Sequence, residues 1–162
     1  MGDKIAIKAS HGFAALAFVL VGTGAFLLFP QEAPDNTVPK GPIHWHPMIS
    51  IFINGEQQTI PPNIGITVGK SIDWDVSGMR MSPMHTHDFD GVIHMEQDRP
   101  KARTLKLGYF FEVWDKTFSD QCIFEYCNGD GGTVKMFVNG EPNYEFGAYE
   151  PKDGDDIVIM YE

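Results

Sequence analysis

The dipeptide Asn-Gly, placed twice between alternating apolar residues, constrains the fold of this chain more than any other feature. It occurs at positions 54–55 within ISIFINGEQQTI and at positions 139–140 within VKMFVNGEPNYEF. Asn-Gly suits the two-residue hairpin turn because both positions of a type I′ turn need positive φ. Asp-Gly at positions 90–91, within HTHDFDGVIHME, carries the same signal. The sequence therefore predicts three β-hairpins.

One helix and a buried strand complete the predicted domain. The segment TLKLGYFFEVWDKTF, residues 104–118, places its large apolar side chains on one helical face, with Thr104 as the predicted cap. Gly108 within it costs about 1 kcal/mol relative to alanine. The unbroken apolar run in DIVIMY, residues 156–161, predicts a central, buried strand. Strands on both sides of one helix predict an α+β fold, with the helix packed on a mostly antiparallel sheet.

The N-terminal residues differ from the rest in hydropathy. Residues 12–29 contain no charged side chain, and a stretch of this length can cross a bilayer core. Lysines precede this stretch and acidic residues follow it, so we expect a membrane anchor at 1–29 with its N-terminus in the cytoplasm. A cleaved signal peptide is the alternative, and it exports the same remainder. Residues 30–42, with four prolines, predict a stiff linker, and residues 43–162 predict one extracytoplasmic domain.

Charge limits the partners of the domain, and its cysteines agree with export. The formal net charge of −10 argues against a nucleic-acid partner, because the phosphate backbone attracts basic proteins. Cys122 and Cys127 lie close together in SDQCIFEYCNGDGG. In an exported protein such a pair predicts a disulfide. Thiolate ligation of a soft metal ion is the alternative.

Five of the six histidines fall in two short stretches, HWHPM and HTHDFDGVIHME. A two-residue turn at 90–91 would pair His87 with His94 and His85 with Glu96. Side chains opposed in this way have Cβ atoms about 4.5–5.5 Å apart and face the same side. The first pair alternates on one strand in the same way. The alternative is a solvated sheet face with scattered histidines. We predict a metal site with the ligands His44, His46, His85, His87 and His94, and with Glu96 as a further ligand or as a residue that orients them.

The methionines near the histidines favour copper. Imidazole binds copper, zinc, iron and nickel, whereas thioethers prefer Cu(I). Met81 and Met84 precede the second histidine pair in MRMSPMH, so we predict them as auxiliary soft ligands, with a simple loop as the alternative. Met48 and Met95 are predicted to fill gaps in the core. Copper is the predicted metal and zinc the alternative.

Two resemblances add to these expectations. The pattern HWHPMISIFINGEQQTIPPNIGI, followed by SPMHTHDFDGVIHME and TLKLGYFFEVW, resembles a family of small exported His-rich proteins of archaea and bacteria. This resemblance implies one functional domain and no particular reaction. The ending VNGE…YEPKDGDDIVIMY resembles the closing strands of β-grasp domains. The cupin motif fits less well, because the interval from His87 to Glu96 is too long and His94 intervenes.

Three functions are consistent with this sequence. The first is a membrane-tethered copper acceptor, chaperone or store, with a membrane copper enzyme as its partner. The second is a mononuclear copper or zinc enzyme that uses Asp88, Asp90 or Glu96 as a general base. The third is an accessory subunit of a membrane complex, in which the histidines only fix an interface.

Overall fold

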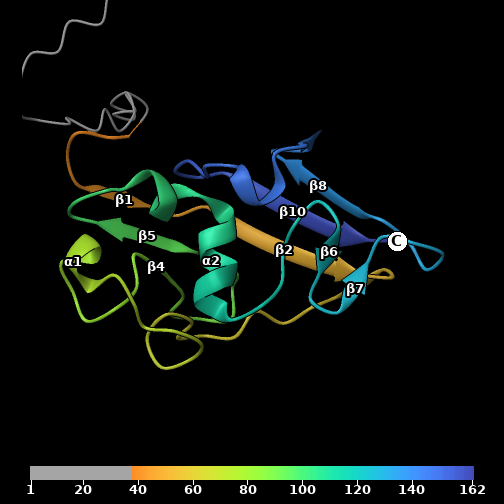
Figure 1. Cartoon of the computed structure of the whole chain (residues 1–162), viewed down its shortest axis with the longest axis horizontal. Coiled ribbons are helices and arrows are strands. Elements are labelled where there is room, and N and C mark those ends of the chain that lie inside the picture. The colour runs from red at the N-terminus through yellow and green to blue at the C-terminus, as the bar shows by residue number, and fades with distance from the viewer. Residues whose placement is uncertain (1–37) are drawn as a thin grey trace, which may run out of the picture. The chain divides into compact units, whose positions relative to one another are not determined.

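The computed structural model describes residues 38–162, which belong to the compact unit Pro34–Glu162. The predicted anchor at 1–29 and most of the linker at 30–42 lie outside the described residues. Among residues 38–162, none of the helices has the length and hydropathy needed to span a membrane. This part of the chain is an α+β domain with mostly antiparallel sheets and two short α-helices, the class that the sequence predicts (Figure 1).

The larger sheet has five strands in the order β3-β2-β10-β8-β9. Both Asn-Gly turns form as predicted, and all four of their residues have positive φ. The last strand, β10, lies at the centre of the sheet, parallel to β2 and antiparallel to β8, which confirms the predicted central strand. The strands are β2 (Met48–Ile53), β3 (Glu56–Gln57), β8 (Val134–Val138), β9 (Glu141–Pro142) and β10 (Asp156–Tyr161).

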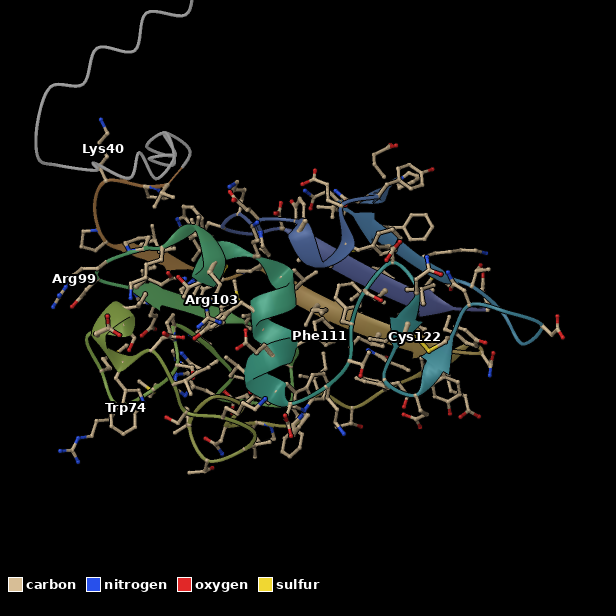
Figure 2. The ribbon with its side chains drawn as sticks, in the orientation of Figure 1. Lys40, Trp74, Arg99, Arg103, Phe111 and Cys122 are labelled. Atoms are coloured by element: carbon tan, nitrogen blue, oxygen red, sulfur yellow. A yellow bond between two sulfur atoms is a disulfide. The ribbon has the colours of Figure 1, made fainter. Side chains whose placement is uncertain are left out.

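Helix α2 (Leu107–Trp114) supplies the aromatic part of the core, and its side chain Phe111 is labelled in Figure 2. The helix is shorter than the predicted range of 104–118. Its N-cap position is Lys106, so the prediction that Thr104 caps it is wrong. Thr104 belongs instead to the 3-10 helix η1 (Ala102–Leu105), where its hydroxyl donates to the side chain of Gln97.

The glycine within α2 has a packing reason. Gly108 lies against Gly147 of the 3-10 helix η2 (Phe146–Ala148). A Cβ atom at position 108 would lie 2.9 Å from the carbonyl oxygen of Gly147, closer than real Cβ atoms come to other atoms. The close approach of α2 and η2 therefore requires glycine at position 108, although glycine has a low helix propensity.

Two small elements complete the part of the chain that the structure describes. The disulfide Cys122–Cys127 forms as predicted and joins β6 (Cys122–Ile123) to β7 (Tyr126–Cys127) (Figure 2). Helix α1 (Trp74–Ser77) has four residues. The sequence predicted one helix and missed α1, because a single turn shows no apolar periodicity.

The smaller sheet has three antiparallel strands, in the order β1-β5-β4. They are β1 (Ile43–Trp45), β4 (Met84–His85) and β5 (His94–Gln97). The predicted two-residue turn at 90–91 is wrong: His85, and not His87, pairs with His94.

Backbone pairing of residues 91–93 explains the different register. The amide of Ile93 donates to the carbonyl of Pro47, and the amide of Ile49 donates to the carbonyl of Gly91. These bonds hold residues 91–93 beside the start of β2, and residues 87–90 form an exposed loop between the two strands. The paired position moves along the strand by two residues, and a shift of two preserves the face on which each side chain lies.

Candidate metal centre

The three-stranded sheet brings four of the six predicted ligands onto one face. His94 and Glu96 are two residues apart on the central strand β5, so both point to the same side. Glu96 pairs directly with His44 on β1, and His94 pairs directly with His85 on β4. Direct cross-strand partners share a face and have neighbouring side chains.

The other two predicted ligands lie just beyond the strand ends. His46 follows β1, and its ring centroid lies 4.8 Å from that of His94. His87 follows β4, and its ring centroid lies 4.5 Å from that of His94. All five imidazoles therefore form one continuous cluster around His94.

The ligand atoms of this cluster gather in two groups that share His94. Within each group, the atoms that could bind a metal ion lie within 4.8 Å of one another. Ligands of one ion, each about 2.0–2.1 Å from it, are at most about 4.2 Å apart, so small rotations of the rings would suffice. We call these sets the outer group, His44, His46, His94 and Glu96, and the inner group, His85, His87 and His94.

The outer group combines exposed imidazoles with a carboxylate. Nε2 of His44 lies 3.0 Å from Oε1 of Glu96, and Nδ1 of His94 lies 3.7 Å from the same oxygen. This nitrogen of His94 is buried and has no hydrogen-bond partner among the described residues. A buried polar atom without a partner is rare in folded proteins and calls for a ligand or water. A metal ion beside Glu96 would satisfy it.

The inner group is more buried, and one of its rings is held in a definite tautomer. The side chain of His85 is 0% exposed, and its Nδ1 lies 3.0 Å from the backbone carbonyl oxygen of Ser82. A carbonyl only accepts, so Nδ1 carries the proton and Nε2 keeps its lone pair. That Nε2 lies 3.2 Å from Nε2 of His87. Metal-bound histidines commonly donate their second N–H to a carbonyl in this way.

Burial keeps two of the rings neutral. Burial lowers the pKa of His85 to about 4 from the ordinary value of 6.5. Burial also lowers the pKa of His94, and the neighbouring rings of His87 and His46 act in the same direction. Only a deprotonated imidazole nitrogen can bind a metal ion. The ring shared by both groups and the innermost ring are therefore available to a cation at neutral pH.

Two residues that support the cluster could not be predicted from the sequence. The carboxylate of Asp153 accepts a hydrogen bond of 2.8 Å from the backbone amide of His46 and lies 3.8 Å from Nδ1 of that ring. Ser82 contributes the carbonyl that orients His85. Asp153 lies 107 residues from His46 in the chain, and a backbone carbonyl leaves no trace in a sequence, so neither carried a signal.

The methionines take different places. Met84 and Met95 are 0% exposed and belong to the core. Met81 is partly buried, and its carbonyl accepts a hydrogen bond from Ser77. The soft-ligand role predicted for Met81 and Met84 stays a prediction. Met48 is 45% exposed, so the prediction that it fills the core is wrong.

A surface pocket adjoins the outer group. Its volume is about 320 Å³, and both His44 and Glu96 line it. The remaining lining comes from the start of β1, the end of β5 and the loop after α1: Pro42, Ile43, Ser77, Met79, Gln97 and Asp98. A small molecule in this pocket would lie next to a metal ion held by the outer group.

Comparison of the chain with protein-family models, with curated proteins and with solved structures finds no match. What supports a function is therefore the geometry of the cluster. Imidazole nitrogens and a carboxylate that gather in two groups, each within 4.8 Å, form a candidate site for first-row transition metal ions.

Proposed function

We propose that this chain is a membrane-tethered, extracytoplasmic copper-binding protein, which accepts, carries or stores copper for a copper enzyme of the same membrane. The observation that carries the proposal is that five imidazoles and one carboxylate gather at one small sheet. Five rings at this spacing would repel one another when protonated, and a bound cation replaces those protons.

The location follows from two features. The Cys122–Cys127 disulfide is typical of proteins that fold outside the reducing cytoplasm. The uncharged residues 12–29 have the length of a membrane span, which would tether the domain. The strand order β3-β2-β10-β8-β9, with β2 and β10 parallel at its centre, supports the β-grasp resemblance of the C-terminal strands.

Copper is preferred to zinc for a chemical reason. For a given set of nitrogen and oxygen ligands, the affinity of divalent ions rises to Cu²⁺ and falls again at Zn²⁺. The cluster offers no thiolate, since both cysteines are in the disulfide. A Met81 thioether beside the imidazoles would add preference for Cu(I).

The test is a metal titration of the full chain, purified in detergent and stripped of metal with a chelator. We expect Cu(II) to bind with a dissociation constant below micromolar, and Zn(II) to bind more weakly. The substitution His87→Ala should weaken copper binding at least tenfold. Tyr144→Ala is the matched control, because it removes a ring that is 84% exposed and belongs to neither ligand group. If neither copper nor zinc is retained at micromolar concentrations, the proposal is wrong.

The pocket beside His44 and Glu96 favours a second candidate, a metalloenzyme with an open coordination position. Azide distinguishes the two, because it binds Cu(II) only where a position is vacant and then gives a charge-transfer absorption band. In a store or carrier the outer group should have no vacant position, so any such band would come from the three-ligand inner group and Met79→Trp should leave it unchanged. A band that is lost in Met79→Trp, which narrows the pocket, would favour the enzyme.

A further inference from the structure

The two ligand groups share a single side chain, His94. This residue lies on β5, the central strand of the three-stranded sheet. On one side, β1 supplies His44, and on the other side, β4 supplies His85. The shared imidazole therefore stands between two sets of ligands that come from opposite edges of the sheet.

One metal ion cannot use all of these ligands. The nitrogen and oxygen atoms around a single ion lie at most about 4.2 Å apart. Among the described residues, the atoms that lie within 4.8 Å of one another form two separate groups, and neither contains both His44 and His85. A single ion would therefore leave one of the two groups largely unused.

The imidazole of His94 has two nitrogens, and one of them lies at the outer group. Its Nδ1 lies on the Glu96 side, 3.7 Å from Oε1, and is buried without a hydrogen-bond partner. The two nitrogens of an imidazole point to different sides of the ring. The ring centroids of His85 and His87 lie 5.5 Å and 4.5 Å from that of His94, and one ring nitrogen of His94 lies within 4.8 Å of a ligand atom of each.

We propose, resting on the copper-binding function above, that the cluster is a dinuclear centre in which His94 bridges two copper ions. The inner ion binds Nε2 of His94 together with His85 and His87, and the outer ion binds Nδ1 of His94 together with His44, His46 and Glu96. A neutral imidazole has one N–H, so the second nitrogen–metal bond forms as that proton leaves to solvent. Neither ion changes its oxidation state. The negative charges of the imidazolate and of Glu96 offset the repulsion between the two cations.

The two positions should fill in a definite order. The inner group has its buried ring already oriented by the Ser82 carbonyl, so little ordering is needed when the ion binds. The outer group uses two exposed rings that must be ordered first. We therefore expect the inner ion to bind first and the outer ion second.

The experiment counts copper and unpaired electrons together. The full chain in detergent is titrated with Cu(II) sulfate, and bound copper per chain is measured by atomic absorption after free copper is removed. The integrated electron paramagnetic resonance intensity is recorded at each step. We expect full intensity at one copper per chain. At two coppers the intensity per copper should fall, because two unpaired electrons on ions that share one imidazolate couple with each other.

Two matched substitutions, His44→Ala and His87→Ala, each remove one exposed ring from one group only. Each variant should bind one copper at full intensity per copper. His94→Ala should remove the coupling and weaken the binding of both ions. Circular dichroism checks that each variant folds. If His94→Ala does not fold, His44→Ala and His87→Ala still test the dinuclear centre.

Three results would overturn the inference, and they differ from one another. Two coppers at full intensity in the unsubstituted chain would mean that the ions do not share His94. One copper per chain would exclude a dinuclear centre and leave the copper-binding function intact. No bound copper would remove the proposed function itself.

Discussion

The five-stranded sheet and the three-stranded sheet differ in what their faces carry. In β2 and β10 of the larger sheet, every second residue is a buried apolar side chain that enters the core. The smaller sheet buries apolar residues on one face, among them Ile43 and Met95, and carries imidazoles and Glu96 on the other. Both sheets contribute to one core, but the smaller sheet also positions a polar cluster on its other face.

This difference separates stability from function. Burial of large apolar side chains stabilises the fold by about 1.5–3 kcal/mol each. A cluster of neutral imidazoles offers no comparable gain without a cation, and its burial lowers the pKa of His85 and His94. We therefore expect substitutions in the larger sheet to change stability, and substitutions in the cluster to change metal binding.

The largest effect on stability should come from the centre of the larger sheet. Ile159 on β10 is 0% exposed, so Ile159→Ala should lower the free energy of unfolding by about 2–5 kcal/mol. Its neighbour Val158 lies on the opposite face of the sheet, so Val158→Ala should lower the free energy of unfolding clearly less. Denaturant unfolding of the metal-free protein measures both. Copper bound per folded chain should not change, and a loss of copper in folded Ile159→Ala would contradict the separation.

The next effect concerns pH and the smaller sheet. His85 has a pKa near 4 when folded and near 6.5 when unfolded, so only the unfolded chain takes up this proton between those values. The free energy of unfolding of the metal-free protein should therefore fall by roughly 3 kcal/mol as the pH decreases from 6.5 to 4, beyond what other groups contribute. Unfolding curves at several pH values measure the slope. The variant His85→Gln lacks this group, and an equal slope in that variant would contradict the assignment.

The disulfide lies outside the cluster and should affect stability alone. Replacement of both cysteines, Cys122→Ser with Cys127→Ser, opens a short loop. It should lower the free energy of unfolding by about 2 kcal/mol. Thermal or denaturant unfolding measures this loss. Copper affinity should stay the same, because neither sulfur belongs to a ligand group. Weaker copper binding in the double variant would point to a structural link between the hairpin and the cluster.

The smallest effect on stability should accompany a clear effect on binding. Glu96 contacts His44 in a partly exposed position, and exposed ion pairs contribute at most about 1 kcal/mol. Glu96→Gln should therefore change the free energy of unfolding by less than about 1 kcal/mol. The copper affinity of the outer group should fall about 10–100-fold. Asp98→Asn is the control, because Asp98 lines the adjacent pocket without belonging to a ligand group. Equal affinity for copper in Glu96→Gln would remove this carboxylate from the site.

Local signals explain which parts of the fold could be predicted from sequence. The Asn-Gly turns at 54–55 and 139–140 are fixed by their own backbone requirements, and both formed. The central position of β10 followed from its unbroken apolar run. The disulfide followed from the short spacing of the only two cysteines. In each case the information lies within a few residues.

The turn at 90–91 shows where local signals fail. Of its two residues only Gly91 has positive φ, and the carboxylate of Asp90 accepts a hydrogen bond from the amide of Val92. Pairing of residues 91–93 with the chain before β2 outweighs the hairpin preference of Asp-Gly. The cluster was still predicted, because a shift of two residues leaves His85 and His94 on one face. The contribution of Asp153 depends on a contact across 107 residues and had no local signal.

X-ray absorption at the copper edge tests the central claim most directly. The full chain in detergent with one equivalent of Cu(II) should show a first shell of imidazole nitrogens at about 2.0 Å, with the outer-shell scattering typical of histidine rings. His94→Ala, which removes the ring shared by both groups, should lower the number of imidazoles, and Tyr144→Ala should leave it unchanged. A first shell of oxygen alone, or a spectrum that is the same in His94→Ala, would contradict a copper site at this cluster.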